Sequence, residues 1–375
     1  MRECENPLWP CAMAGAAACC AGFEGLTVVI HGSSGCYYYP ATLLHAPLHG
    51  TFIMENEVIF GTEQRLREVL DGLSGAGNKI AVVLTCVPSA MGEDIRSILS
   101  DYDVILVDSP GFSGDVEAGY HHALSILAPS VDPDREGINI DGACLFDPFF
   151  KGNIQEIVRL LGNASVPAGT VFCSDRLESV SHATPYTIGT NGDFSSGVGT
   201  VLGGTLGFDE IRTTFNAIAS VYPDADCGPV EEEMEREEER IVRACDKFLR
   251  RFDPPHAVIF SGFSYAVFAA KTLRHYLDAE ILFVGSRNEP GACPYLCEQV
   301  QGLSEVRNII RQYNPDLVIG SSFERSVNPD LAFIGLTPPV RGVVKLAPRP
   351  VAGITGTLLF VEDVLNTCRD KKKRS

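Results

Sequence analysis

The most constraining feature of this chain is the alternation of short, β-branched apolar runs with segments of helical spacing. Such runs are typical of strands that are buried on both faces of a parallel sheet, with helices as the crossover connections. The expected strands are 26–30, 80–84, 104–107, 143–146, 170–173, 186–188, 257–260, 281–284 and 317–319. The pattern therefore predicts an α/β protein of three tandem Rossmann-like units with parallel sheets.

Two segments rich in turn residues, 128–137 and 222–229, divide the chain. A chain of 375 residues also exceeds what one hydrophobic core usually fills. We therefore expect an N-terminal Rossmann-like domain at 1–130, a second at 138–226 and a third at 230–375. The third is expected to open with a long helix over 230–252, whose glutamates come early and whose basic residues come late, as suits the helix dipole. A shorter helix is expected over 63–73 in the first domain.

The charge balance limits the partners and the setting of this chain. Its net charge of −18 argues against a nucleic-acid binder, which would carry a basic surface. No run of 18 apolar residues is present, so we expect no membrane span, and the basic residues 371–374 are expected to form a solvated tail. The apolar stretch 12–31 lacks the basic start of a signal peptide and is interrupted by Glu24. Thirteen cysteines in a chain of this size are then expected as free thiols in a reducing cytoplasm.

Three cysteines stand out because each lies in a glycine-rich setting. Cys11 precedes Gly15, Cys36 closes the segment His31-Gly32-Ser-Ser-Gly35-Cys36, and Cys86 precedes Gly92. Cys36 and Cys86 follow expected strands closely, and open α/β sheets place their sites at the carboxyl ends of strands. Thiolates prefer iron–sulfur clusters or zinc, and glycine lets a bulky cluster approach the backbone. Free cysteine is also a common small core residue, so the residues alone leave ligation and core packing evenly balanced.

Other cysteines give weaker indications. We expect Cys19 and Cys20 on a helix, Cys144 and Cys173 within strands, and Cys245 on the long helix, all as inert core residues. Cys293 and Cys297 are expected in a loop or core role because no second pair has zinc spacing, and Cys4 is a reserve ligand.

The absence of several motifs is informative as well. The chain has no Gly-x4-Gly-Lys-Ser/Thr phosphate loop, no Gly-x-Gly-x-x-Gly fingerprint after a strand and no Gly-x-Ser-x-Gly elbow. It is therefore not expected to hydrolyse ATP or to bind a nicotinamide cofactor, and any electrons must be delivered by another protein or a small carrier. No catalytic residue is identified from the sequence.

A set of motifs in order along nearly the whole chain resembles the nitrogenase component 1 family. The motifs are Cys11-x3-Gly15-Ala16, His31-Gly-Ser-Ser-Gly-Cys36, Glu57-Val-Ile-Phe-Gly61, Cys86-Val-Pro-Ser-Ala-Met-Gly-Glu-Asp-Ile95, Ser109-Pro-Gly-Phe-Ser-Gly114, Asn314-Pro-Asp-Leu-Val-Ile-Gly320 and Gly353-Ile-Thr-Gly356. Each piece alone is a weak signal. Together, in this order and with three correctly spaced cysteines, they form a strong one.

The resemblance implies three Rossmann-like domains per subunit and an iron–sulfur cluster that bridges two subunits. It also implies a separate ATP-hydrolysing iron protein that supplies electrons one at a time. On this resemblance Cys11, Cys36 and Cys86 are the cluster ligands in the N-terminal domain, and Gly15, His31, Gly32, Gly35 and Gly92 form the cofactor-binding surroundings. Members of the family reduce dinitrogen, protochlorophyllide, chlorophyllide or a nickel-sirohydrochlorin, and others assemble the nitrogenase cofactor or cleave carbon–sulfur bonds.

Departures from the family pattern narrow the expected function. Segments 191–194 and 341–348 lack the cysteine and the histidine that hold the iron–molybdenum cofactor, which argues against dinitrogen reduction on this chain. We expect a subunit of a two-component reductase that acts on a tetrapyrrole-type substrate, with a [4Fe–4S] cluster preferred over a larger one. The second subunit would be a copy of this chain or a paralogue.

The substrate itself stays open at this point. In its short length the chain is similar to the subunit of the nickel-sirohydrochlorin a,c-diamide reductive cyclase. The subunits of the dark-operative protochlorophyllide reductase are the other related group. The residues around Cys36, Ser33-Ser34 and Tyr37-Tyr38-Tyr39, do not clearly match the first subgroup. The alternatives to a reductase are a non-catalytic scaffold for metallocluster assembly and a cluster-free binding subunit.

Overall fold

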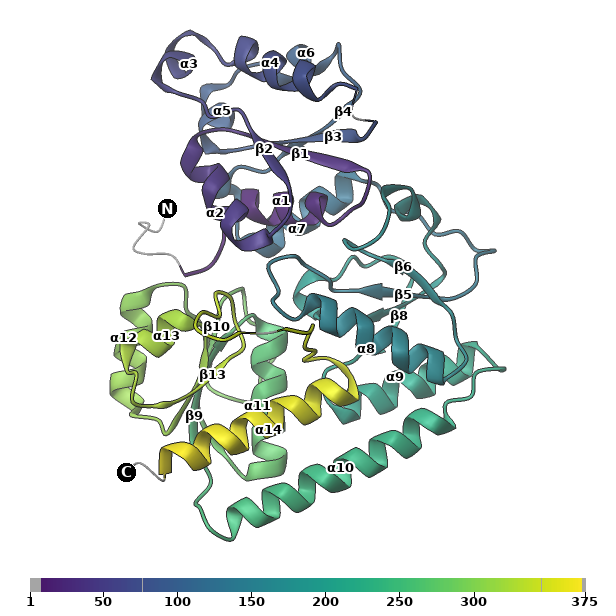
Figure 1. Cartoon of the computed structure of the whole chain (residues 1–375), viewed down its shortest axis with the longest axis vertical. Helices are drawn as coiled ribbons and strands as arrows, with labels where there is room; N and C mark the ends of the chain where they lie inside the picture. The colour runs from purple at the N-terminus through teal and green to yellow at the C-terminus, as the bar shows by residue number, and fades with distance from the viewer. Residues whose placement is uncertain (1–7, 76, 345, 373–375) are drawn as a thin grey trace.

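The computed structural model describes residues 8–75, 77–344 and 346–372, and Figure 1 shows three α/β units along this chain. Cys4 and the last residues of the basic tail lie outside the described residues. Each unit contains its own sheet, and every neighbouring pair of strands in the three sheets is parallel. The three parallel sheets confirm the predicted fold class.

The first unit has a four-stranded sheet in the order β2-β1-β3-β4. Its strands are β1 (Leu26–His31), β2 (Leu48–Gly50), β3 (Lys79–Leu84) and β4 (Val104–Asp108). Its helices are α1 (Ala12–Ala21), α2 (Ser34–Leu44), α3 (Glu55–Phe60), α4 (Glu63–Leu73), α5 (Cys86–Met91), α6 (Ile95–Leu99) and α7 (Val116–Ile126). The central strands β1 and β3 pair along six residues, so their carboxyl ends at His31 and Leu84 lie side by side.

The second unit has a sheet in the order β6-β5-β7-β8. Its elements are β5 (Ile138–Asp141), α8 (Phe150–Asn163), β6 (Ala168–Val171), β7 (Tyr186–Gly189), β8 (Thr200–Gly204) and α9 (Phe208–Val221).

The third unit follows the long helix α10 (Gly228–Leu249) and has a five-stranded sheet in the order β11-β10-β9-β12-β13. Its further elements are β9 (His256–Ser261), α11 (Phe263–Leu277), β10 (Glu280–Ser286), β11 (Cys297–Gln299), α12 (Leu303–Tyr313), β12 (Leu317–Gly320), α13 (Ser322–Val327), β13 (Ala332–Gly335) and α14 (Gly353–Lys372).

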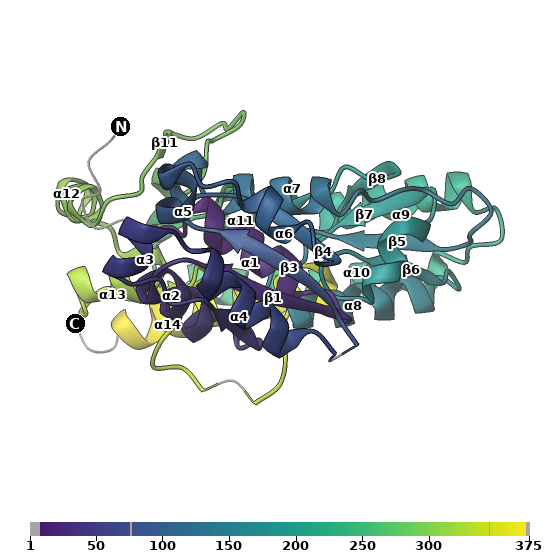
Figure 2. The same cartoon turned by 90° about the horizontal axis from the view of Figure 1, so that it is seen from above.

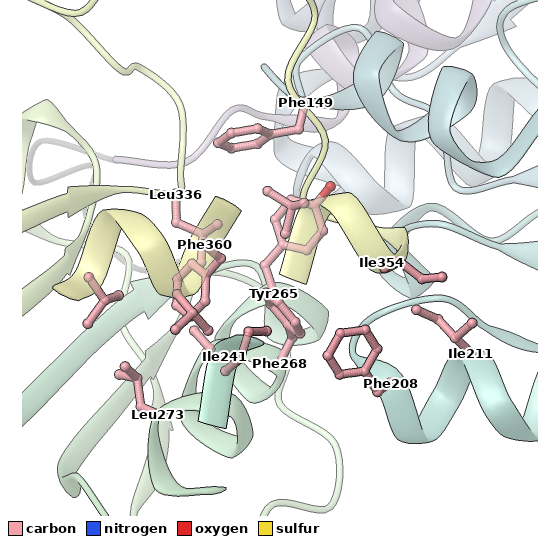
Figure 3. Close-up of a cluster of buried hydrophobic side chains, with 14 of the residues drawn as sticks. Phe149, Phe208, Ile211, Ile241, Tyr265, Phe268, Leu273, Leu336, Ile354 and Phe360 are labelled. Atoms are coloured by element: carbon pink, nitrogen blue, oxygen red, sulfur yellow. The ribbon is translucent and has the colours of Figure 1, made fainter. Parts of the chain in front are cut away.

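The second and third units share one hydrophobic core. Helices α10 and α14 run along both units in Figure 1, and α14 contacts α8 and α9 as well as β13. Figure 3 shows Phe208 and Ile211 of α9, Phe268 of α11, and Ile354 and Phe360 of α14 within this buried cluster. The boundaries at 130, 138, 226 and 230 stay predictions. The hydrophobic packing is continuous across the boundaries at 226 and 230, because α10 packs against both the second and the third unit.

The first unit is held together by close packing of α1 on α7, which lie side by side in both Figure 1 and Figure 2. A Cβ on Gly15 would lie 1.8 Å from the carbonyl oxygen of Val116, and one on Gly119 would lie 1.7 Å from that of Ala12. Any side chain at either position would therefore separate the helices. This contact fixes the start of α1, where Cys11 lies.

Most of the predicted strands are confirmed, and one is wrong. Residues 143–146 are not a strand, because β5 ends at Asp141 and Gly142 turns the chain with φ +83°. Strand β6 ends at Val171, so neither Cys144 nor Cys173 lies in a strand. The helix over 63–73 is confirmed, and the long helix lies at Gly228–Leu249. Within the described residues, no helix is long and apolar enough to cross a bilayer.

Candidate functional site

The three cysteines singled out by the sequence lie at the starts of three different helices of the first unit. Cys11 is the N-cap residue of α1, Cys36 is the third residue of α2, and Cys86 is the first residue of α5. The N-terminus of a helix carries partial positive charge and unpaired N–H groups, which favour a thiolate over a thiol. At Cys11 this effect is outweighed by burial, which leaves the pKa of its thiol raised overall.

Gly111 brings two of these thiols together. A Cβ added to Gly111 would lie 3.1 Å from the Sγ of Cys11 and 3.2 Å from the Sγ of Cys86. Gly111 begins a short turn, Gly111–Ser113, directly after β4. The absence of a side chain at this position leaves open the space between the two sulfur atoms.

Cys36 also lies close to Cys11, because its thiol contributes to the pKa of Cys11. Burial raises the pKa of the Cys11 thiol, the backbone N–H groups of Ala14 and Met13 lower it, and the neighbouring Cys86 and Cys36 thiols raise it. The structure thus brings Cys11, Cys36 and Cys86 into one region, although they are 25 and 50 residues apart in the sequence. Each of the three is only partly buried, so the group lies at the surface of the first unit.

The glycines predicted around the thiols have different positions. Gly32 lies against Thr85, since a Cβ there would meet the Oγ1 of Thr85 at 2.0 Å, so it allows the ends of β1 and β3 to converge. Gly92 ends α5 with φ +70°, a backbone conformation that favours glycine. Gly35 has open space around it, and Gly15 faces α7 rather than the thiols.

His31 is fully buried and has a hydrogen-bond partner at each ring nitrogen. Its Nδ1 lies 3.1 Å from Thr51 Oγ1, and its Nε2 lies 3.0 Å from Thr62 Oγ1. Burial lowers the pKa of His31 to about 4, and the nearby Glu93 carboxylate opposes this shift. Both nitrogens are therefore engaged inside the protein, and the contribution of His31 to the site is to anchor the turn that carries Gly32.

Two buried hydroxyl groups, which are close to Cys86 and Gly111 in the sequence, lack a hydrogen-bond partner among the described residues. They are Thr85 Oγ1 and Ser109 Oγ. Thr85 directly precedes Cys86, and Ser109 lies two residues before Gly111. A buried hydroxyl without a partner is costly, and its presence at a site points to a ligand that would satisfy it.

The three cysteines are candidate ligands for an iron–sulfur cluster. Among the described residues, no group of three or more His, Cys, Asp or Glu side chains is arranged to hold one ion. A cluster has several iron atoms, so its thiolate ligands need not converge on one point. The open space at Gly111 and the unpaired hydroxyls of Thr85 and Ser109 provide room and hydrogen-bond donors for such a group.

The first unit exposes a set of apolar side chains, here called the apolar face, and Tyr39 in this set lies near Cys11. The apolar face comprises residues of α2, of the segment before α3, of α3 itself and of the turn after β4: Tyr38, Tyr39, Phe52, Met54, Val58, Ile59, Phe60 and Phe112. Ile59, Phe60 and Phe112 are 71%, 85% and 64% exposed. Phe52 also has φ +52°, an uncommon conformation for a bulky residue. A patch of this kind on a folded protein marks an interaction surface.

A second group of cysteines is buried between the first and second units, away from the exposed face. Cys19 and Cys173 have their Sγ atoms 3.4 Å apart, and Cys20 and Cys144 lie nearby. Burial raises the pKa of Cys20 to about 12, and it raises the pKa values of Cys19 and Cys144 well above the usual value. Their burial agrees with the predicted core role, as does that of Cys245 on α10.

One functional element was not identified from the sequence. Residues 109–114 form one of the motifs that resemble the family, but only the fold shows that Gly111 faces two thiols. The pair of glycines directly after a strand was the available signal.

Comparison with known proteins places the chain in a family. The family model described as nitrogenase component 1 type oxidoreductase matches residues 11–369, and the chain belongs to this family of oxidoreductases. The chain is 29% identical over 191 residues to the nitrogenase molybdenum-iron protein beta chain of Bradyrhizobium diazoefficiens, covering 42% of this chain and 36% of that protein. It is 27% identical over 174 residues to the nitrogenase iron-iron protein alpha chain of Rhodobacter capsulatus, covering 36% and 33%. The matched segments thus span about a third of the length of these curated relatives.

The fold is similar to that of a solved nitrogenase structure. The structure titled nitrogenase Cp1 at pH 6.5 superposes with a TM-score of 0.83 at 17% identity, over 99% of this chain and 94% of that one. At this identity the likeness shows the fold alone. The predicted family and fold class are both confirmed.

Proposed function

We propose that this chain is a subunit of a nitrogenase-like, two-component reductase of the cytoplasm. Cys11, Cys36 and Cys86 hold an iron–sulfur cluster at the interface with a second subunit, and a [4Fe–4S] cluster is preferred over a larger one. An ATP-hydrolysing iron protein supplies low-potential electrons, and the substrate is a tetrapyrrole.

The observation that carries this proposal is the convergence of the three thiols beside Gly111. Cys11 and Cys86 both face the space at Gly111, and Cys36 is close enough to raise the pKa of Cys11. A group of three partly exposed thiols at helix starts suits a soft, electron-rich cofactor. A core role would bury them fully, as it buries Cys19 and Cys173.

The apolar face supports a shared cluster. It includes Tyr39 of α2, which lies near Cys11, so a partner that binds there would bury part of the thiol region. The relatives include a beta chain and an alpha chain, which supports a paired subunit here as well. The partner is then either a second copy of this chain or a paralogue.

When bound, the cluster would supply one-electron transfer at low potential. The residues of this chain hold it through three thiolates and position it with the N–H groups at the starts of α1, α2 and α5. The hydroxyls of Thr85 and Ser109 offer donors to the sulfur atoms, and such bonds tune a cluster's potential. Gly111 keeps the space between Cys11 and Cys86 free.

The remaining parts of the proposal depend on the sequence. The chain has no phosphate loop, so ATP hydrolysis belongs to a separate protein. Segments 191–194 and 341–348 supply neither cysteine nor histidine for a second metal centre. A substrate that is itself conjugated and accepts electrons directly, such as a tetrapyrrole, is consistent with that absence.

The experiment that tests the cluster is the change Cys86→Ser in anaerobically purified protein. We expect wild-type protein to contain iron and sulfide and to absorb near 400 nm, and the variant to lose most of that absorbance. The matched control is Cys245→Ser, a buried thiol on α10 in a different unit. Equal iron content in wild type and Cys86→Ser would overturn the assignment of Cys86.

The same preparation separates the two alternatives. A scaffold for metallocluster assembly would contain the cluster but show no turnover with an iron protein and a tetrapyrrole. A cluster-free binding subunit would contain no iron although Cys36 is intact.

A further inference from the structure

A sizeable cavity of the described structure lies between the second and third units. It has a volume of about 790 Å³, within the range of small-molecule sites. One wall is the glycine-rich end of β7 and β8 with the start of α9, and the other is α11. Apolar side chains line both walls, including Leu206, Phe208, Val267 and Phe268. Figure 3 shows Phe208 and Phe268 on these two neighbouring helices.

The rim of this cavity is basic on the α11 side. Lys271, Arg274 and His275 are all exposed and lie three and four residues apart, so they share one face of the helix. Within the described chain, neither Lys271 nor Arg274 has a carboxylate within the 4.0 Å of an ion pair, whereas many basic residues elsewhere do. A basic rim with no paired acid is notable in a chain of net charge −18, and it favours a ligand with negative charge.

Two acidic residues, Asp209 and Glu210, also line the cavity, at the start of α9. Asp209 lies 3.8 Å from Arg212, on its own helix. Glu210 accepts a hydrogen bond from the backbone N–H of Leu206 at 3.1 Å and lies near enough to Lys271 to feel its charge. The two cations therefore lie together on the α11 side of the rim, and the two carboxylates lie on the α9 side.

The cavity is separated by one loop from the segment that carries Cys11. Thr190 and Gly192 line the cavity, while Asn191 and Asp193 face a small pocket beside Trp9, two residues before Cys11. Asp193 ties this loop to α11, because its carboxylate accepts hydrogen bonds from the Ser264 N–H at 3.1 Å and the Ser264 hydroxyl at 2.8 Å. A ligand in the cavity would therefore be separated from the segment that carries Cys11 by the loop 190–193.

From this arrangement we infer that the cavity binds a large, flat, apolar ligand that carries carboxylates. Its apolar walls would cover the ring system, and Lys271, Arg274 and His275 would pair with the carboxylates. A tetrapyrrole acid has this chemistry, so the inference rests on the proposed function for the natural ligand and adds its binding site. Specificity would come from the three basic groups, since apolar walls alone cannot distinguish charged from uncharged rings.

The test measures binding by fluorescence, without turnover, with two porphyrins of similar size. One is coproporphyrin, which has four carboxylates, and the other is a tetracationic N-methylpyridyl porphyrin. We expect coproporphyrin to bind with one site per chain, and the double change Lys271→Glu with Arg274→Glu to weaken it at least tenfold. The same change should not weaken the cationic porphyrin.

The matched control is Lys247→Glu with Arg250→Glu, which makes the same change in net charge on the exposed face of α10. We expect the control to keep its affinity within about twofold of wild type, because electrostatic effects beyond about 10 Å are screened at ordinary salt. A third variant, Val267→Trp, fills the cavity and should abolish binding while the thermal unfolding midpoint shows that the protein is folded.

Equal weakening by the α11 and α10 changes, or failure of wild type to bind coproporphyrin, would overturn the inference. The result is independent of the cluster, because binding needs no iron. Protein that lacks iron but binds coproporphyrin through Lys271 and Arg274 would refute the proposed function and leave this site standing. Protein that contains the cluster, but whose affinity for coproporphyrin is unaffected by the α11 change, would refute this site and leave the proposed function standing.

Discussion

Cys11 and Cys86 flank the same point of the backbone, because a Cβ on Gly111 would lie 3.1 Å from one Sγ and 3.2 Å from the other. Cys11 caps α1 and Cys86 starts α5, so two separate helices direct their thiols at one turn. Gly111 is thus a sensitive position, where one methyl group enters the space between the sulfur atoms.

We predict that Gly111→Ala lowers the iron content of the anaerobically purified protein to less than half of the wild-type value. The methyl group would sit at a distance tighter than ordinary carbon–sulfur contact and displace a bound cluster. The control is Gly72→Ala on α4, where a Cβ meets nothing within 4 Å and alanine should stabilise the helix by about 0.5–1 kcal/mol. Iron and sulfide analysis decides the matter: full iron content in Gly111→Ala would mean that no cluster occupies this space.

The apolar face gives a second prediction, on assembly. Ile59 and Phe60 are 71% and 85% exposed on α3, so replacing both with glutamate should not disturb the core. Two charges placed in an interface would face a desolvation cost. We therefore expect the double variant to sediment as a monomer under conditions where wild type forms an oligomer, and to lose iron with it.

The control for assembly is a pair of equally drastic changes elsewhere on the surface. Val158 on α8 and Val242 on α10 are 42% exposed and lie in other units. Val158→Glu with Val242→Glu should leave both the oligomer and the iron content intact. An oligomer that persists in Ile59→Glu with Phe60→Glu would show that the subunits meet elsewhere.

A third prediction concerns Trp9 and Glu117. The Nε1–H of Trp9 donates to both carboxylate oxygens of Glu117, at 2.8 and 3.1 Å. Burial raises the pKa of Glu117 well above its usual value, Asp115 raises it further, and the Trp9 hydrogen bond lowers it. Trp9 is the single tryptophan of the chain, so its fluorescence reports on this carboxyl group directly.

The sign of the pH effect follows from the raised pKa. Between the unfolded value near 4.5 and the higher folded value, the folded state binds more protons than the unfolded state. The contribution of Glu117 to stability is therefore full below about pH 4.5 and is lost as the pH rises through the folded pKa. Glu117→Gln should remove this loss, so the variant gains stability relative to wild type as the pH rises.

The measurement is Trp9 emission against pH in wild type and in Glu117→Gln. We expect a transition above pH 4.5 in wild type and none in the variant, since glutamine accepts the indole hydrogen bond without titrating. The control is Glu63→Gln, which changes an exposed acid on α4. Its Trp9 emission should show the same transition with pH as that of wild type. An identical transition in Glu117→Gln would assign it to another group, such as Asp193, whose pKa burial also raises.

The strands that the sequence predicted and those that it missed differ in their place in the sheets. Central strands such as β1, β3 and β9 carry continuous apolar runs, because both of their faces are buried. Five strands were not expected: four of them, β2, β8, β11 and β13, lie at sheet edges, and the fifth, β5, is central. An edge strand has fewer neighbours and needs no such run, so its sequence resembles that of a loop.

The wrong strand at 143–146 has a tertiary cause. The true strand β5 contains Asn139, which looks unsuited to a buried strand. Its side chain donates to the Thr184 carbonyl at 2.7 Å and accepts from the Thr170 and Thr184 N–H groups at 3.1 and 2.9 Å. These partners come from distant segments, so the sequence alone could not show that Asn139 would be satisfied.

The three thiols of the candidate site could be singled out from the sequence, and their surroundings could not. The thiols carried a local signal, because each stands among glycines near the end of a predicted strand or the start of a predicted helix. The facing position at Gly111 and the unpaired hydroxyls of Thr85 and Ser109 depend on how β3 and β4 lie side by side. Such relationships arise only from the folded sheet.

The last prediction concerns a buried ion pair in the third unit. Arg287 follows β10 and Glu324 lies on α13, and both side chains are fully buried. Arg287 also donates to the Val300 carbonyl at 2.8 Å, while Glu324 accepts from the Ser321 N–H and hydroxyl, both at 2.6 Å. The pair therefore ties the ends of β10 and β12 together.

Removing one partner leaves the other as an uncompensated buried charge. We expect Glu324→Gln to destabilise the protein by about 3–5 kcal/mol, the usual cost of breaking such a pair. Replacing both, as in Arg287→Met with Glu324→Leu, should recover much of this loss because no unpaired charge remains. The surface pair of Arg176 and Glu178 is 74% exposed on both sides, and Glu178→Gln should cost less than about 1 kcal/mol. Denaturant unfolding of the four proteins measures the difference, and equal midpoints for Glu324→Gln and Glu178→Gln would show that the buried pair contributes no more than a surface one.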